Sequence, residues 1–292
     1  MNQELFKSFN SCLRYKQAHY LTKPFLNPCR FIRNQIRQKR RNTVGTVETV
    51  DTFHAQDFTI VAGEIVSEGL FCYGIMEPQL TEAFLHLVKP GQTTVDIGMH
   101  LGYFTTLFAG LVGPSGKVHA FEPTPSTREI AARNTERFSN VTVHPNAMWS
   151  HHETMTFHDY GLAHMAFNSV TAARLDYEVL SVREHQVEAI SLDEFRKHLA
   201  CRIDVIKIDA ETAEEQILQG ARNLLKSDQP IVTLEIGDEG TETGRSSNLI
   251  ETLSLMDYEA WEFIEGRFRR HSPRKVYSYD NLIFTHSSKP LD

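Results

Sequence analysis

Apolar residues along most of this chain follow two alternating patterns. From residue 92 onward, short continuous apolar runs, typical of buried strands, are separated by segments in which apolar residues recur at helical spacing. The runs predict strands at 93–97, 118–121, 141–144, 204–208, 231–236, 260–264 and 281–285. The intervening segments predict helices at 103–111, 126–137, 213–225 and 247–256.

This alternation predicts an α/β fold with a seven-stranded, mostly parallel sheet that helices cover on both faces. No helix separates the last two strands, so we expect them to form an antiparallel terminal hairpin. The stretch at about 150–200 breaks the rhythm, with strands near 153–159 and 185–190 around an irregular loop. An insertion at a sheet edge is a common place for substrate contacts.

Two segments precede the main sheet. Residues 46–53 and 58–62 predict a short hairpin, and 78–87 predicts a helix that starts at a proline. Pro24 and Pro28 divide the first segment into helices at about 4–22 and 28–41. We therefore expect a helical extension over 1–45, a lead-in hairpin and helix over 46–90, and the main domain over 91–288.

Charge is distributed unevenly along the chain. Residues 1–42 hold ten Lys and Arg against the single acid Glu4, a net +9, which leaves −16 for the rest because the whole chain carries −7. An acidic body disfavours nucleic acid as a partner. The basic extension either contacts an anionic membrane or acidic partner, or packs on the body or a second copy. The second interpretation is favoured because its apolar positions keep no single helical stripe.

The cysteines and the apolar runs bear on the compartment. The four cysteines are scattered with no metal-ligand spacing, which indicates reduced thiols. No apolar run approaches the roughly 20 residues that span a bilayer, and the N-terminus lacks the apolar stretch of a signal peptide. We expect a cytoplasmic protein. The basic extension also allows a peripheral location on the inner face of the membrane.

The first predicted strand runs into a glycine-containing turn and then a helix. Gly98 would allow a tight turn and close approach of a ligand, and Gly102 would allow close packing of the helix that begins at Tyr103. The free N–H groups of that helix would face an anionic group. Asp96, His100 and Tyr103 complete the candidate cofactor residues of this segment.

Glu122 follows the second predicted strand, twenty residues after Gly102. A carboxylate there can accept both hydrogen bonds of a ribose diol. The turn lacks the close glycine pair of G-x-G-x-x-G, and Asp96 would repel a pyrophosphate but suit an amino group. These details favour S-adenosylmethionine over a nicotinamide dinucleotide. A nicotinamide-dependent dehydrogenase and a non-catalytic scaffold remain the alternatives.

In these motifs the sequence resembles the FkbM-type methyltransferases, which belong to the Rossmann-like class I methyltransferases. The resemblance extends from about Gly74 to His286, and its carriers are GIMEP at 74–78, KPG at 89–91, VDIG at 95–98, GYFT at 102–105, FEP at 121–123, IKIDAE at 206–211, Gly220-Ala221 and Leu234-Glu235. It implies S-adenosylmethionine as cofactor and O-methylation of a hydroxyl on a sugar, a glycan or another natural product. The sequence departs from the family at Thr212, because the family usually has Gly directly after the residue that corresponds to Glu211.

Carboxylates after the fourth and fifth strands are the candidates for chemistry on the acceptor. An alcohol that attacks a methyl group must lose a proton, which requires a general base or a metal ion. Asp209 and Glu211 are the candidate catalytic residues, with His100 as a further candidate base, and Asp209 also adjoins the cofactor turn. Together with Glu235 the two acids could instead hold a divalent metal ion. Each could equally be a helix cap or an ion-pair partner.

Five further positions are candidate ligand contacts. Asn146 and Ala147 follow the third strand, where class I methyltransferases hold the adenine, and Asn146 could hydrogen-bond an exocyclic amine. Glu77 either reaches the cofactor or caps the helix that follows it. Asn168-Ser169 in the insertion could face the acceptor. Lys207 alternates with apolar residues in a buried strand, so we expect it to pair with a carboxylate.

Overall fold

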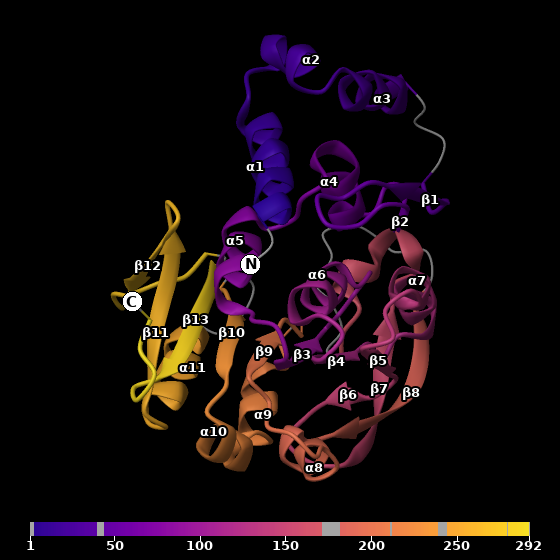
Figure 1. The fold of residues 1–292 in the computed structure, drawn as a ribbon. Coiled ribbons are helices and arrows are strands. Elements are labelled where there is room, and N and C mark those ends of the chain that lie inside the picture. The colour runs from indigo at the N-terminus through magenta and orange to yellow at the C-terminus, as the bar shows by residue number, and fades with distance from the viewer. Residues whose placement is uncertain are drawn as a thin grey trace.

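The computed structural model describes residues 3–39, 44–170, 182–210, 212–238, 244–278 and 280–291. Its centre is an eight-stranded sheet with the order β12-β11-β13-β10-β9-β3-β4-β5 (Figure 1). The strands of this sheet are β3 (Thr93–Ile97), β4 (Lys117–Phe121), β5 (Val141–His144), β9 (Val205–Ile208), β10 (Ile231–Ile236), β11 (Tyr258–Ile264), β12 (Arg267–Arg270) and β13 (Asp280–His286).

All seven strands predicted for the main sheet are confirmed. Five strands, β10, β9, β3, β4 and β5, run parallel to one another, and β13 lies antiparallel between β10 and β11. The additional strand β12 pairs with β11 across the two residues Glu265 and Gly266, which both have positive φ angles, of 52° and 75°. A two-residue turn of this kind matches the twist of a hairpin. The sequence of β12, RFRR, lacks the apolar run on which the strand predictions were based.

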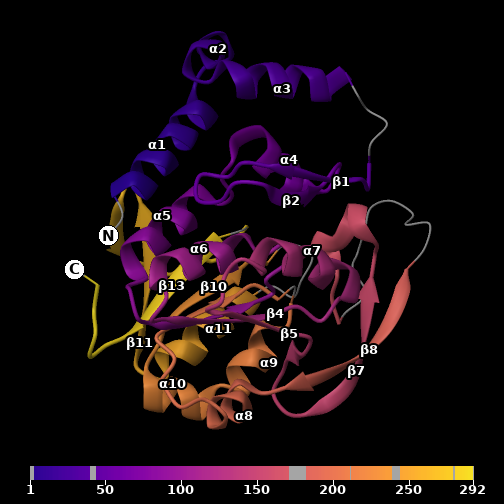
Figure 2. The ribbon, with the colours of Figure 1, turned by 45° about the vertical axis from the view of Figure 1, so that its right-hand side comes forward.

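Helices cover both faces of the sheet, as Figure 2 shows. On one face lie α5 (Pro78–Leu87), α6 (Tyr103–Val112) and α7 (Pro125–Thr135), and on the other lie α8 (Leu192–Lys197), α9 (Glu214–Gln219), α10 (Arg222–Asp228) and α11 (Arg245–Ser254). Two large clusters of buried apolar side chains fill the spaces between sheet and helices. The α/β architecture with both faces covered is therefore confirmed.

The helix predicted at 213–225 is divided into α9 and α10 at Gly220. The carbonyl oxygen of Trp149 lies so close that a Cβ at position 220 would be 2.3 Å from it. This contact comes from a segment far away in the sequence. The apolar spacing of 213–225 therefore could not show where the helix ends.

Helix α4 (Ile65–Tyr73) was not predicted from the sequence. Glu64 caps its N-terminus, because the carboxylate accepts hydrogen bonds from the N–H groups of Val66 and Ser67 at 3.0 and 2.7 Å. Glutamate is not among the residues preferred at this position, which are Ser, Thr, Asp and Asn. The usual start signal is thus missing from the sequence.

The insertion forms its own small sheet. β6 (Ala147–Met148), β8 (Arg183–Ile190) and β7 (Glu153–Asp159) lie in this order, and the two predicted strands near 153–159 and 185–190 are confirmed as β7 and β8. A short 3-10 helix, η2 (Leu162–Phe167), follows β7. Residues 171–181 of the insertion lie outside the described residues.

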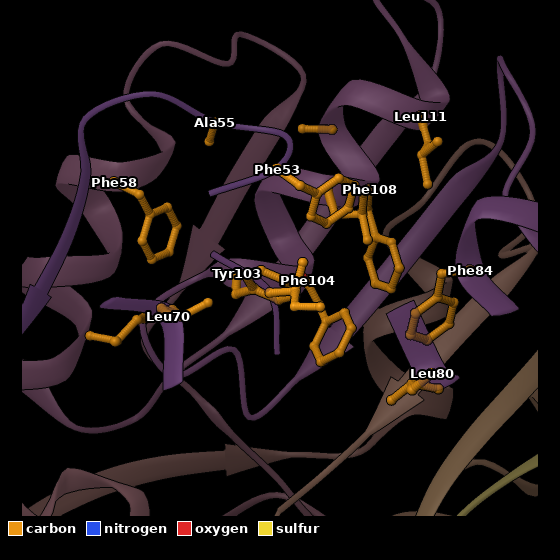
Figure 3. Close-up of a cluster of buried hydrophobic side chains, with 14 of the residues drawn as sticks. Phe53, Ala55, Phe58, Leu70, Leu80, Phe84, Tyr103, Phe104, Phe108 and Leu111 are labelled. Carbon is orange, nitrogen blue, oxygen red and sulfur yellow. The ribbon is translucent and has the colours of Figure 1, made fainter. Parts of the chain in front are cut away.

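The lead-in segment contains the predicted hairpin, β1 (Val47–Val50) paired antiparallel with β2 (Phe58–Val61), and the predicted helix α5. Its apolar side chains share a core with α6 (Figure 3). The rings of Phe84 and Phe108 pack edge to face at 4.7 Å, and those of Phe84 and Phe104 at 5.4 Å. Phe9 of the N-terminal extension belongs to the same cluster and lies 5.4 Å from Phe53.

The N-terminal extension comprises α1 (Gln3–Gln17), η1 (Tyr20–Thr22), α2 (Lys23–Leu26) and α3 (Pro28–Lys39). The two predicted helices thus correspond to α1 and α3, and Pro24 lies in the first turn of the separate helix α2. In both ribbon views α2 and α3 form the outermost layer beyond α4. No helix within the described ranges is long and apolar enough to cross a membrane.

Candidate functional site

A cavity of about 470 Å³ opens at the carboxyl ends of the central strands. Its walls come from the carboxyl ends of β3, β4, β9 and β10 and from the segments that follow the first three, while α4, the residues just before α5 and the insertion add others. In an open parallel sheet this edge is where ligands bind. The volume falls within the range of roughly 300–1,000 Å³ that is usual for small-molecule sites.

Most of the candidate site residues meet at this cavity. The predicted positions that line it are Glu77, Gly98, His100, Tyr103, Glu122, Asn146, Ala147, Asn168, Asp209 and Glu235. Asp96, Gly102 and Ser169 are not among the residues that line it. Glu211 lies outside the described residues.

The turn after β3 has a left-handed backbone at three positions: Gly98, His100 and Gly102, with φ angles of 73°, 50° and 84°. The space that a side chain at Gly98 would need is already occupied by the protein, since a Cβ there would lie 1.8 Å from the carbonyl oxygen of Asp209. A Cβ at Gly102 would approach Met99 at 3.3 Å and Thr135 of α7 at 3.6 Å. The lack of a side chain at both glycines therefore allows the turn to pack closely against neighbouring segments of the protein.

Behind this turn, Lys207 forms the centre of a buried charge cluster. Its ammonium lies 3.0 Å from Asp209 and 3.6 Å from Asp96, and it sits 5.2 Å from the ring centre of Phe104. Burial alone would lower the pKa of Lys207, but Asp209, Asp96 and Glu77 outweigh it and hold that pKa above its usual range. This geometry agrees with the expectation that Lys207 pairs with a carboxylate.

Asp96 is completely buried and engaged in this cluster. Its Oδ2 accepts a hydrogen bond of 2.6 Å from the hydroxyl of Thr105 in α6, while its Oδ1 has no hydrogen-bond partner and faces Lys207. Burial raises the pKa of Asp96, although Lys207 and Thr105 oppose the shift. Asp96 thus joins the end of β3 to α6 and to β9 from behind the cavity wall.

Asp209 faces the cavity with a side chain that is 22% exposed. Burial would raise the pKa of Asp209, but Lys207 and a hydrogen bond with Glu235 outweigh it and hold that pKa below its usual range. Asp209 is therefore ionised at neutral pH. Its negative charge faces the part of the cavity next to the glycine turn, where a ligand would bind.

Glu122 lies directly after β4 and is only 6% exposed. Its carboxylate accepts hydrogen bonds from the N–H groups of Thr124 at 2.9 Å and His100 at 3.2 Å. Burial raises the pKa of Glu122 to about 7, although these hydrogen bonds and Arg128 oppose the shift. The glycine turn and Glu122 are thus joined by a direct hydrogen bond.

The ring of His100 is mostly buried and lies beside the cavity. Its Nε2 has no hydrogen-bond partner and lies 3.9 Å from Glu64, the cap of α4. Burial lowers the pKa of His100, although Glu64 and Asp209 oppose the shift. The imidazole is therefore neutral at pH 7 and retains a ring nitrogen that can accept a proton.

Glu77 precedes α5 with an unusual backbone φ of 38° and makes no capping hydrogen bond to that helix. Its carboxylate instead accepts a hydrogen bond of 2.8 Å from the side-chain amide of Asn281 in β13. Burial and the nearby Asp209 raise the pKa of Glu77 to about 7. Of the two predicted roles, capping and ligand contact, only the second is compatible with this geometry.

Glu77 also belongs to a second cavity of about 340 Å³ at the same edge of the sheet. The polar side chains of that cavity include Glu262, Arg274, Asp280 and Asn281. None of the four was predicted from the sequence. They come from β11, β13 and the loop between β12 and β13, and no local motif marks them.

The positions expected to hold an adenine lie beside the insertion. Ala147 belongs to β6, and the side-chain amide of Asn146 donates to the carbonyl oxygen of Glu188 in β8 at 3.2 Å. Asn168 accepts a hydrogen bond of 2.8 Å from the N–H group of Tyr160. Ile65 and Val66 of α4 form part of the wall, and sequence reasoning missed them together with their helix.

The acids proposed as metal ligands do not form a recognisable metal site. Across the ranges that the structure describes, no group of three or more His, Cys, Asp or Glu side chains is arranged to hold an ion. Asp209 and Glu235 hydrogen-bond each other. The proposed third ligand, Glu211, falls in a gap between these ranges.

A mostly parallel sheet with a glycine turn after β3, a buried carboxylate after β4 and a cavity between them defines a class of protein: the Rossmann-like, S-adenosylmethionine-dependent methyltransferases. The family model described as the methyltransferase FkbM domain matches residues 96–265. The chain therefore belongs to the FkbM methyltransferase family, as the resemblance in its motifs predicted.

Curated relatives match shorter segments. The protein-L-isoaspartate O-methyltransferase of Methanococcoides burtonii is 37% identical over 73 residues, which is 24% of this chain and 36% of the relative. The enzyme of the same name from Aeropyrum pernix is 37% identical over 65 residues, or 22% of this chain and 25% of the relative. The matched segments span about a third or less of these relatives.

Solved structures of methyltransferases are similar at low identity. The methyltransferase FkbM from Methylobacillus flagellatus KT is 15% identical with a TM-score of 0.43, covering 75% of this chain and 52% of that one. Aeropyrum pernix fibrillarin with natively bound S-adenosyl-L-methionine is 15% identical with a TM-score of 0.42, covering 71% and 74%. Neither likeness is close enough to indicate an acceptor, and the exclusion of nucleic acid stays a prediction.

Proposed function

We propose that this protein is an O-methyltransferase that transfers a methyl group from S-adenosylmethionine to a hydroxyl of a sugar, a glycan or another natural product. The observation that carries the proposal is the buried carboxylate of Glu122, which lies at the cavity and accepts a hydrogen bond from the backbone of His100 in the glycine turn. An acid in this place suits the diol of a ribose.

The residues around the cavity fit the remaining parts of this cofactor. Ala147, Asn146 and apolar neighbours such as Phe157 and Pro123 suit a flat adenine ring. The turn at 98–102 and the first N–H groups of α6 suit the amino-acid end, because a helix N-terminus attracts a carboxylate. When bound, S-adenosylmethionine supplies a methyl group on a sulfonium.

The second cavity is the proposed place for the acceptor. It adjoins the first at Glu77, and its polar side chains can both donate and accept hydrogen bonds. Arg274 is held there by Asp280 at 2.7 Å and Glu262 at 2.5 Å. A hydroxyl-rich molecule is recognised by such a mixed set of donors and acceptors, which supports a sugar-like acceptor.

The acceptor hydroxyl has to lose a proton, and three described side chains are candidates to receive it: Asp209, His100 and Glu77. Asp209 is paired with Lys207, and its lowered pKa makes it a weak base. His100 is neutral and has a free ring nitrogen, but its pKa is lowered too. Glu77 adjoins both cavities and has a pKa near the working pH, where a general base is most effective. We therefore add Glu77 to the proposed catalytic residues.

Cofactor binding can be tested before any acceptor is known. The wild-type protein is titrated with S-adenosylhomocysteine in a calorimeter, and NAD⁺ is titrated in parallel. We expect saturable binding of the first and none of the second, and about tenfold or greater weakening in Glu122→Gln. The absence of S-adenosylhomocysteine binding to correctly folded protein would refute the proposed function.

The acceptor class is tested by label transfer. The protein is incubated with methyl-labelled S-adenosylmethionine and a panel of sugars, glycans, hydroxylated natural products, RNA and protein, and products are read by mass spectrometry. The proposal predicts label on a hydroxyl oxygen and loss of transfer in Glu77→Gln with unchanged S-adenosylhomocysteine affinity. Label on RNA or protein would keep the methyltransferase and reject the proposed acceptor.

A further inference from the structure

Helix α3 packs on the body with its basic side. Arg30, Arg33 and Arg37 recur at spacings of three and four residues and therefore share one face of the helix. Arg33 donates to the carbonyl oxygen of Phe71 in α4 at 2.7 Å and lies 4.6 Å from the centre of its ring. Arg37 lies 4.2 Å from the same ring centre and forms ion pairs with Glu48 and Glu68.

The apolar side of α3 points the other way. Ile32 and Ile36 are 58% and 48% exposed, although a surface helix normally turns such residues toward the core. Further exposed apolar side chains lie in η1 and α2, which precede α3 and contact each other and α3, and among them Phe25 is 88% exposed. We call this surface the outer apolar face; its members are Tyr20, Leu21, Phe25, Leu26, Ile32 and Ile36.

A patch of this kind on a soluble protein indicates an interaction surface. Two features favour a lipid bilayer over a protein partner. The face lies on the outermost layer of the molecule, where α2 and α3 project beyond α4 (Figures 1 and 2), and a projecting layer suits a deformable surface. Aromatic and aliphatic side chains next to basic ones are the usual composition of segments that lie in the headgroup region.

Charge identifies the kind of bilayer. Residues 1–42 carry ten Lys and Arg against one acid, whereas the whole chain is negative. Within the described part of α3, only Arg37 forms ion pairs; Arg30 and Arg33 donate to backbone carbonyls. These arginines face the body, so the attraction to anionic lipid comes from the summed charge of residues 1–42, which includes the exposed Arg14 and Lys16 of α1.

We propose that the outer apolar face docks this protein onto an anionic lipid bilayer, with Phe25 and its neighbours inserted among the headgroups. Helix α4 lies between α3 and the cavity and contributes Ile65 and Val66 to the cavity wall. Docking therefore holds the cavity one helix away from the bilayer. The proposal does not depend on the identity of the methyl acceptor.

The experiment is flotation of the full chain with vesicles of phosphatidylcholine alone or with about 30% phosphatidylglycerol. We expect binding to the anionic vesicles only, weakened when NaCl is raised from about 0.05 M to about 0.5 M. The triple variant Leu21→Ser/Phe25→Ser/Ile32→Ser should bind at least about tenfold more weakly. The control is Leu255→Ser, because Leu255 is 80% exposed but lies after α11, and it should bind like the wild type.

Calorimetric titration with S-adenosylhomocysteine accompanies each variant, and unchanged affinity shows that the fold is intact. Equal flotation of the triple variant and the control would overturn the proposal, as would the absence of wild-type binding to anionic vesicles. Light scattering decides a third outcome. A wild-type dimer that the triple variant converts to a monomer, without vesicle binding by either, would identify the face as an interface between two copies and reject the lipid.

Discussion

The carbonyl oxygen of Asp209 occupies the space that a side chain at Gly98 would need. The two residues follow β9 and β3, which are adjacent parallel strands, and a Cβ at position 98 would lie 1.8 Å from that oxygen. This contact brings the turn of the cofactor site and the carboxylate of Asp209 to the same point of the sheet edge. It makes the glycine a structural requirement of the site.

We expect Gly98→Ala to destabilise the protein by at least about 3 kcal/mol, because the new methyl group meets backbone and φ at this position is +73°. Urea unfolding measures the change. Gly110→Ala is the matched control, since Gly110 lies in α6 with nothing within 4 Å of the place that its new methyl group would take, and there the helix should gain roughly 0.5–1 kcal/mol. Equal effects of the two substitutions would contradict the role assigned to Gly98.

The sequence predicted the sheet well because four of the five parallel strands, all but the edge strand β5, are buried along most of their length and leave mostly apolar runs. The sequence also predicted that Glu122 belongs to the ligand site and that Lys207 pairs with a carboxylate. A charged residue directly after a buried strand, or within one, needs a ligand or an ion-pair partner. It could not show that Gly98 faces Asp209, or that Gly220 faces Trp149 and ends α9. Both contacts join segments far apart in the chain. The second cavity was missed for the same reason.

Thr212 has a φ of 80°, a left-handed conformation in which a β-branched residue is strained. This is the position where the family usually has Gly. We expect Thr212→Gly to stabilise the protein by up to about 1 kcal/mol, less the entropy that glycine adds to the unfolded chain. Thermal unfolding at fixed pH measures it. A clear loss of stability would mean that interactions of the Thr212 side chain outweigh the strain.

Lys207→Met should destabilise the protein by roughly 3–5 kcal/mol, because it leaves the buried carboxylate of Asp96 without its cation. The pKa of Asp209, which Lys207 helps to hold down, should rise in the same variant. Denaturant unfolding at pH 7 tests the first effect. Lys117→Met, at the exposed first residue of β4, serves as the control and should change little.

The raised pKa of Glu122 predicts how the stability of the ligand-free protein depends on pH. Its pKa is about 7 in the folded protein and ordinary in the unfolded chain, so folding favours the protonated form. Protonated Glu122 therefore adds up to about 3 kcal/mol to the free energy of unfolding. This stabilisation is complete below the pKa that Glu122 has in the unfolded chain, and it is lost as the pH rises through about 7. Unfolding measured from about pH 5 to about pH 8 should show a steeper decline for the wild type than for Glu122→Gln.

Cofactor binding should depend on pH in the opposite direction. In the proposed complex the ionised carboxylate of Glu122 accepts the two hydrogen bonds of the ribose. Below pH 7 the carboxyl group of Glu122 is mostly protonated in the ligand-free protein, because its pKa is about 7, so the ligand then has to displace a proton in order to bind. The affinity for S-adenosylhomocysteine should therefore rise about tenfold from about pH 6 to about pH 8. Glu122→Gln should bind more weakly with little dependence on pH, whereas Glu136→Gln, at the exposed end of α7, should behave like the wild type. The same pH dependence in Glu122→Gln would assign the titration to another group.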